Sequence, residues 1–194
     1  MKQGFLAKVK AAASYILELV HVVVISLAII IPIRYFLIQP FYVKCASMEP
    51  SFYDHEYLII DEISYRFREP QRGDVVVFKY PNDPSQYFIK RIIGMPGETV
   101  EIKDGRVRVY KEEGSIGYYL NESQYLSGAE TYADRKFNIG ENEYFILGDN
   151  RTSSMDSRIF GPVHEKLIVG RVWLRGWPIT KFRIFRTPEY NLIQ

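Results

Sequence analysis

The sequence predicts a mainly β protein, a twisted and mostly antiparallel β-domain attached to one N-terminal membrane helix. Two observations carry this prediction. A long apolar run lies near the N-terminus, and short β-branched and aromatic segments between polar turns fill most of the remaining chain. Aromatic residues make up 15% of the sequence, with 15 Tyr and 12 Phe, and these side chains favour strands.

The apolar run at residues 15–36 has the composition of a membrane anchor. Between Leu19 and Ile33 no side chain carries a fixed charge. The run approaches the roughly 20 residues that cross a bilayer core, and Pro32 is expected to kink the helix or help to end it. Because the leader at residues 1–14 contains lysines and no acidic residue, we expect it in the cytoplasm and the chain beyond the helix outside.

Other interpretations of this run fit the sequence less well. A cleaved secretory signal needs a small-x-small site after the run, and residues 33–44 contain none. A lipoprotein acceptor needs small residues before its cysteine, but Cys45 follows Val43 and Lys44. A buried helix of a soluble protein conflicts with the basic leader and the apolar length. We therefore expect a signal anchor that stays in place.

Charge and cysteine content exclude several classes of protein. Lys and Arg total 25 against 23 Asp and Glu, a balance that argues against nucleic acid as a partner. The single cysteine, Cys45, cannot form an internal disulfide. The histidines His21, His55 and His164 are far apart, and the chain has no CxxC or HExxH motif. We therefore expect no metal and no cofactor.

Short segments beyond the anchor read as strands, and one pair reads as a hairpin. In "TVEIKDGRVRVY" (99–110) apolar residues alternate on both sides of Asp104-Gly105, which suits a tight turn. Between Lys111 and Asn142 the chain is polar and glycine-rich, which indicates an insertion or small subdomain. The other expected strands are "YLIID" (57–61), "DVVVFKY" (74–80), "QYFIKRIIG" (86–94), "EYFILGDN" (143–150) and "LIVGRVWLRGW" (167–177).

Ser47, in "VKCASMEPSF" just beyond the anchor, is a candidate nucleophile. Its ordinary interpretation is a turn residue, because serine favours turns that contain proline. A serine hydroxyl attacks well only when a base removes its proton. Histidine is the usual base, but His55 in "YDHEY", the nearest, and His164 after "GPV" both read as loop residues. Lysine is the alternative base, as in Ser–Lys dyads.

Lys90 is the best candidate for that base. A lysine must be neutral to accept a proton, and burial lowers its pKa. In "YFIKRIIG" strand alternation places Lys90 with Phe88 and Ile92 on one face and Arg91 on the other. The ordinary interpretation is a lysine whose amine extends from the strand into solvent. Lys79 is a weaker candidate because it ends its strand beside a proline.

A third polar stretch is "LGDNRTSSMDSRIFG" at residues 147–161. Polar clusters of this kind are usually solvated loops. A buried neutral lysine, however, needs partners that orient it, and a hydroxyl group can donate to or accept from its amine. The stretch is therefore also a candidate for the support of Lys90.

Taken together, these stretches resemble the bacterial type I signal peptidases, or leader peptidases. Four segments carry the resemblance, and with the anchor they span nearly the whole chain in the family's order. The segments are "SMEP" (47–50), "RGDVVVF" (72–78), "YFIKRIIGMPGE" (87–98) and "GDNRTSSMDSR" (148–158).

The resemblance implies roles for individual residues. Ser47 is expected to be the nucleophile, with its backbone N–H in the oxyanion hole, and Lys90 the general base. Ser154 matches the serine that orients the lysine, and Asp156 and Arg158 match a structural ion pair. Gly148 and Asp149 are supporting residues in the same segment. The family fold also implies a catalytic core at residues 37–99 and 143–194, with an inserted β-subdomain at residues 100–142.

The sequence departs from the family pattern at two positions. Ser51 stands where threonine is common, and it is still a hydroxyl residue. Cys45 stands where well-known members have a serine whose hydroxyl donates to the oxyanion hole. A thiol is a weaker donor, and an ionised thiol is itself a nucleophile. Because the segment aligns on Ser47, we expect Ser47 rather than Cys45 to be the nucleophile, and the resemblance assigns Cys45 no definite role in the oxyanion hole.

The expected function is removal of N-terminal signal peptides from exported preproteins, after a small-x-small site, by a monomer in the bacterial cell membrane. Its partners are then secretory preproteins and the lipid bilayer. The alternatives are a catalytically idle, membrane-anchored binding module and a Ser–Lys processing peptidase of narrow specificity. We expect apolar side chains near Ser47 to form a substrate or membrane rim: Met48, Phe41, Tyr42 and Phe52.

Overall fold

The computed structural model describes residues 2–36, 38–112, 114–126, 128, 130–188, 190 and 192–193, with the backbone alone at 2–12, 33–36, 38–39 and 192–193. The chain divides into two compact units, one up to residue 38 and one from residue 39 onward. Each unit is described below by itself.

The first unit is the helix α1 (Lys2–Phe36), a single helix of 35 residues. Within it, Ala13–Pro32 is a candidate membrane span of 20 residues with a mean hydropathy of 2.4, and its side chains are not buried by protein. The expected leader at residues 2–14 is helical as well, so the helix begins well before the apolar run. Pro32 lies inside the helix and does not end it.

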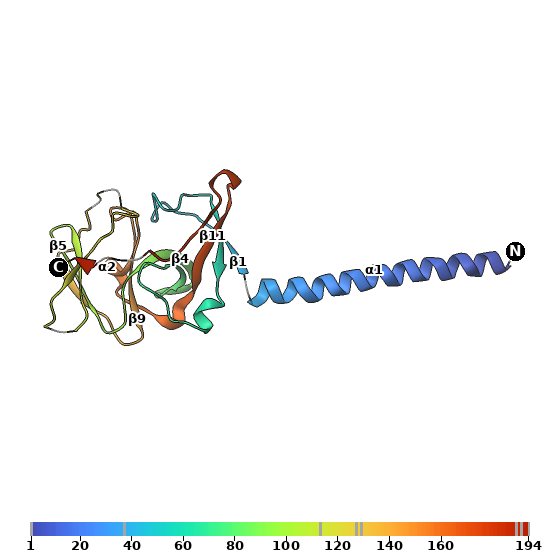
Figure 1. Cartoon of the computed structure of the whole chain (residues 1–194), viewed down its shortest axis with the longest axis horizontal. Helices are drawn as coiled ribbons and strands as arrows, with labels where there is room; N and C mark the ends of the chain where they lie inside the picture. The colour runs from blue at the N-terminus through green and yellow to red at the C-terminus, as the bar shows by residue number, and fades with distance from the viewer. Residues whose placement is uncertain are drawn as a thin grey trace. The chain divides into compact units, whose positions relative to one another are not determined.

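The second unit is mainly β, as the sequence predicts, and its larger sheet contains eight of the described strands. Their order is β1-β2-β11-β3-β4-β9-β10, with β12 paired to β11. Figure 1 labels β1, β11, β4 and β9 of this sheet. The assigned registers are antiparallel, and β11 lies between β2 and β3 and pairs with both. The bounds are β1 (Ile38–Tyr42), β2 (Tyr57–Asp61), β3 (Val75–Tyr80), β4 (Asp83–Gly94), β9 (Glu143–Leu147), β10 (Val163–His164), β11 (Ile168–Trp177) and β12 (Arg183–Ile184).

A second sheet has the order β13-β7-β6-β5-β8 among the described strands. The predicted hairpin is confirmed: Lys103 pairs with Arg106, and Asp104 and Gly105 have positive φ angles of 50° and 74°. The strand β13 comes from the far end of the chain, so this sheet is not built from residues 100–142 alone. The bounds are β5 (Thr99–Lys103), β6 (Arg106–Tyr110), β7 (Tyr118–Leu120), β8 (Arg135–Asn138) and β13 (Leu192–Ile193).

Short helical turns fill some connections between the strands. They are η1 (Ser64–Arg66), α2 (Ser157–Phe160), η2 (Glu165–Leu167) and η3 (Ile179–Lys181).

The strands β3 and β4 contribute to apolar clusters on both of their faces. Val75, Val77 and Ile89 belong to one cluster, whereas Val76 and Ile92 belong to another. Burial on both faces explains why these strands read as continuous apolar runs. Lys90 and Arg91, in the second half of β4, therefore lie in the protein interior.

Candidate active site

Ser47 lies in a loop that follows β1 and is tied at both ends. Val43 N donates to Glu56 O at 2.9 Å, and His55 N donates back to Val43 O at 3.1 Å. Within the loop, Phe52 N donates to Met48 O at 2.8 Å. These backbone hydrogen bonds fix the shape of the loop, although its residues belong to no strand.

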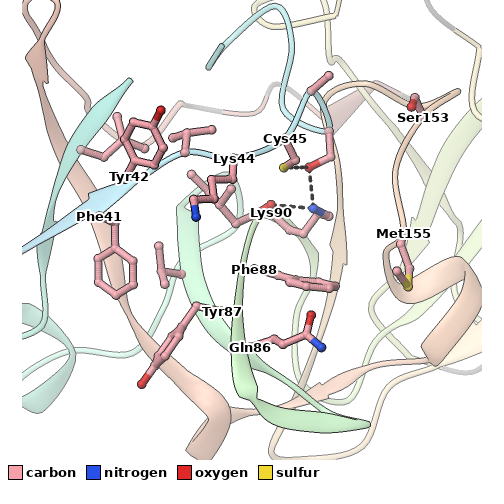
Figure 2. Close-up of a pocket in the computed structure, with 16 residues that line it drawn as sticks. Phe41, Tyr42, Lys44, Cys45, Gln86, Tyr87, Phe88, Lys90, Ser153 and Met155 are labelled. Carbon is pink, nitrogen blue, oxygen red and sulfur yellow. Dashed lines mark hydrogen bonds between the residues drawn. The ribbon is translucent and has the colours of Figure 1, made fainter. Parts of the chain in front are cut away.

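Lys90 extends from β4 to this loop and contacts Ser47. Its Nζ donates to Ser47 Oγ at 2.7 Å and to Ile89 O at 2.8 Å (Figure 2). Lys90 is 3% exposed and Ser47 is 7% exposed. These two hydrogen bonds orient the buried amine of Lys90 toward the hydroxyl of Ser47.

Burial shifts the acid–base balance of Lys90. Desolvation of the ammonium group lowers the pKa of Lys90 below its usual value, while negative charge at Cys45, Asp156 and Asp149 opposes this shift. The net direction is downward. A neutral amine within hydrogen-bond distance of a hydroxyl is able to accept its proton.

Neither candidate histidine hydrogen-bonds to Ser47 among the described side chains. His55 is largely exposed, has a positive φ of 66°, and contacts Asp54 and Tyr42. His164 accepts a hydrogen bond from Lys166 N at 3.2 Å. The arrangement favours lysine as the partner of Ser47.

Cys45 is a second neighbour of the Ser47 hydroxyl. Its Sγ lies 3.1 Å from Ser47 Oγ, and either atom is able to donate (Figure 2). The thiol is free and the residue is exposed. The Ser47 hydroxyl therefore lies between a buried amine and an accessible thiol.

The segment at residues 148–154 packs against the Ser47 loop. Asn150 N donates to Ser47 O at 3.0 Å, and Asn150 Nδ2 donates to Ala46 O at 3.1 Å. A Cβ on Gly148 would lie 2.1 Å from Ser154 Oγ and 2.5 Å from Ser47 O. This close approach requires glycine at position 148.

Ser154 does not form the bond that the resemblance implies. Its Oγ is buried and has no hydrogen-bond partner among the described residues, so it does not bond to Lys90 in this structure. The bonds of Lys90 Nζ go to Ser47 and to the backbone of β4 instead. Packing against Gly148 nevertheless keeps Ser154 beside the Ser47 loop.

Asp156 and Arg158 form an ion pair, with 2.8 Å between Oδ1 and Nε. Asp156 also caps α2 by accepting from Arg158 N, and it accepts from Gly148 N at 3.0 Å. The fully buried carboxylate of Asp156 thus joins the start of α2 to the segment that holds Ser47.

Asp149 forms a buried pair with Arg91 that sequence reasoning missed. Arg91 Nε lies 2.8 Å from Asp149 Oδ1, and Nη2 lies 2.6 Å from Oδ2. Burial alone would lower the pKa of Arg91, but the Asp149 carboxylate raises it. Strand alternation correctly places Arg91 opposite Lys90, but no local pattern identifies a partner 58 residues away.

A cavity of about 510 Å³ opens beside Ser47 and Lys90. Its wall is mostly apolar, as Figure 2 shows for the labelled aromatic side chains. The lining also includes Tyr87 and Met155, to which the sequence assigns no role, and Ser153 from the polar stretch at residues 147–161. Within the described residues, no group of three or more His, Cys, Asp or Glu side chains is placed to hold a metal ion.

Two of the four expected rim residues line this cavity, and two do not. Phe41 and Tyr42 are part of its wall. The prediction is wrong for Met48 and Phe52, which are 0% exposed and belong to an apolar core cluster. After Ser47 the loop turns toward the protein core, so these two side chains pack in the core and hold the loop in place.

A buried lysine amine that hydrogen-bonds to a serine hydroxyl at the end of an apolar cavity is the arrangement of a candidate serine peptidase site. A profile of the family described as signal peptidase, peptidase S26, matches residues 16–177. The chain therefore belongs to the signal peptidase family, peptidase S26, and is a serine endopeptidase.

Two relatives, matched by sequence, agree with this assignment. The chain is similar to a probable signal peptidase I-2 of Synechocystis sp., with 37% identity over 171 residues that cover 85% of this chain and 75% of the relative. It is also similar to the signal peptidase IB of Staphylococcus aureus, with 34% identity and coverage of 90% and 96%. A crystal structure of a signal peptidase I from Enterococcus faecalis V583 aligns at 32% identity with a TM-score of 0.42, covering 54% of this chain and 97% of that one.

Proposed function

We propose that this endopeptidase removes N-terminal signal peptides from exported preproteins, through an acyl-enzyme on Ser47 with Lys90 as general base. The observation that carries the proposal is the 2.7 Å bond from Lys90 Nζ to Ser47 Oγ, between two buried side chains. The lowered pKa of Lys90 supports its role as a base.

The reaction begins when Lys90 takes the proton of Ser47 Oγ, which attacks the scissile carbonyl carbon. The resulting oxyanion is stabilised by the backbone N–H of Ser47, a contribution of about 3–4 kcal/mol for one such donor. The C–N bond then breaks, and Lys90 delivers its proton to the leaving amine. A water molecule, deprotonated by Lys90, then attacks the acyl carbon. The bond from that carbon to Ser47 Oγ breaks, Lys90 returns the proton to Oγ, and the signal peptide leaves.

The apolar cavity supports a hydrophobic substrate segment beside Ser47. Phe41, Val43 and Ile89 contribute to its wall. We propose that small side chains, above all alanine, occupy the first and third positions before the cut, as the family resemblance implies. Phe41 and Tyr42 form the substrate or membrane rim in this proposal.

The helix α1 supports a membrane location. Its 20-residue apolar span is long enough to cross a bilayer core. We propose a monomeric, single-pass protein of the bacterial cell membrane, with the N-terminus in the cytoplasm and the catalytic unit outside. The lysines before the span and their lack of acidic neighbours support this orientation. We also propose that residues 100–142 form an inserted subdomain. The strand β13 adds to its sheet by pairing with β7.

The test uses the purified full chain in detergent and a preprotein with an Ala-x-Ala site. We expect one cut after the second alanine, identified by the mass of both products. Replacing either alanine by a bulky residue should abolish the cut, while replacing the middle residue should not. Cleavage that ignores both alanines would contradict the proposed specificity, and no cleavage of any preprotein would favour an idle binding module.

A further inference from the structure

Arg151 joins the segment beside Ser47 to the connection between β7 and β8. Its side chain is 0% exposed, and its Nε donates to Gly148 O at 3.1 Å. Its Nη1 donates to Glu122 Oε2 at 2.9 Å, its Nη2 donates to Glu122 Oε1, and Nη1 also donates to Thr131 Oγ1. One buried guanidinium thus connects two segments that are far apart in the sequence.

The Glu122 carboxylate is also linked to Asp149, in the segment beside Ser47, through Tyr125 and Arg91. Tyr125 OH donates to Glu122 Oε1 at 2.7 Å, and the Tyr125 ring lies under the Arg91 guanidinium, with 4.0 Å from Cζ to the ring centroid. Arg91 in turn pairs with Asp149. The contacts therefore form a chain that starts at Asp149, passes through Glu122 and ends at Arg151.

Asn150 lies between the two ends of this chain of contacts. Its backbone N–H and its side-chain amide hold the carbonyl groups of Ser47 and Ala46. The flanking residues Asp149 and Arg151 are both fixed by buried ionic contacts. The position of the Ser47 backbone therefore depends on contacts that are made by the β7–β8 connection.

We propose that Glu122 is a positioning residue for the reaction: through Arg151 and Tyr125 it fixes the 148–151 segment, and through Asn150 it fixes the Ser47 backbone. This inference rests on the proposed function. Catalysis is sensitive to such placement, since a misplacement of about 1 Å from a distant mutation costs up to about 100-fold in rate. Glu122 does not contact the substrate in this account.

The pair also contributes to stability, because breaking a buried ion pair leaves an uncompensated charge. Burial would lower the pKa of Arg151, but the neighbouring Glu122 carboxylate raises it, so the guanidinium stays charged. A loss of stability alone would thus not separate a positioning role from a structural one. The test must measure the rate and the local order at Asn150 in protein that is still folded.

The experiment compares Glu122→Gln with Glu130→Gln in the full chain in detergent, at a temperature at which both variants are folded by circular dichroism. Glu130 is the matched control, because it is an exposed carboxylate in the same connection that accepts from Tyr132 OH at 2.7 Å. For Glu122→Gln we expect kcat to fall about 10- to 100-fold with KM changed less than about threefold. Hydrogen exchange of the 148–151 segment, followed by mass spectrometry, should accelerate.

Rescue provides a third readout. Glu122→Asp keeps the negative charge on a shorter side chain, so its kcat and exchange rate should lie between those of wild type and Glu122→Gln. A Glu122→Gln variant with the kcat or the exchange rate of wild type would overturn the proposal. If wild type cuts no preprotein, the proposed function fails, and the exchange comparison still decides whether Glu122 holds the Ser47 loop.

Discussion

Lys90 and Ser47 are 43 residues apart in the chain, yet Lys90 Nζ lies 2.7 Å from Ser47 Oγ, with both side chains buried. Burial makes this contact chemically useful, because it lowers the pKa of the amine that faces the hydroxyl. The contact also depends on its supports: the 148–154 segment holds the Ser47 backbone, and β4 holds Lys90. Each of these features leads to a measurable expectation.

The pH dependence of cleavage should follow Lys90. Because the base must be neutral, kcat/KM should rise with pH as Lys90 loses its proton, and burial should place the midpoint below the ordinary lysine pKa of about 10.4. The electrostatic interaction with Cys45 raises the pKa of Lys90, so Cys45→Ala should move the midpoint to lower pH. A pH–rate profile of both proteins checks this, and a wild-type midpoint at or above that of free lysine would contradict the account.

Cys45 should make the site sensitive to thiol reagents. Its exposed thiol lines the cavity 3.1 Å from Ser47 Oγ, so a methanethiosulfonate adduct there should block cleavage. Cys45→Ala should resist the reagent and should lose less than about tenfold in kcat/KM, the equivalent of one weak hydrogen bond. Residual activity after complete modification of wild type would show that this part of the cavity does not hold substrate.

Gly148→Ala should damage both fold and activity. The added Cβ would meet Ser154 Oγ and Ser47 O at 2.1 and 2.5 Å, so the segment beside Ser47 must shift. Overpacking of this kind costs about 1–3 kcal/mol in the free energy of unfolding. Thermal unfolding and kcat measure the two effects. Gly176→Ala is the control, since its Cβ would meet nothing closer than 3.7 Å, and equal behaviour of the two variants would refute the steric argument.

Asp149→Asn should destabilise the protein strongly, because it leaves Arg91 buried without its counter-charge. We expect a loss of about 3–5 kcal/mol, measured by denaturant unfolding. The control is Lys136→Met, which removes a pair with Glu101 at 3.5 Å in which Lys136 is 59% exposed. That change should cost less than about 1 kcal/mol. Similar losses for both variants would contradict the importance of burial.

The sequence predicts the parts of the fold that depend on local patterns. Alternation and turn chemistry predict the hairpin at Asp104-Gly105 and the placement of Lys90 and Arg91 on opposite faces of β4. The direction of the loop after Ser47 has no such local signal, so the burial of Met48 and Phe52 was not predicted. Sequence periodicity also does not predict ion pairs between distant segments, such as Arg91–Asp149 and Arg151–Glu122. The same holds for β13, which joins a sheet whose other strands end more than 50 residues earlier.

The most direct test of the central claim compares wild type with Ser47→Ala, Lys90→Met and Lys79→Met on a preprotein with an Ala-x-Ala site. Lys79 is the matched control, because it is a half-buried lysine on the neighbouring strand β3. A Ser47–Lys90 dyad predicts the same cut, located by mass, for wild type and Lys79→Met, and no product for the other two. Cleavage that survives Ser47→Ala or Lys90→Met would contradict the dyad and would move attention to the Cys45 thiol.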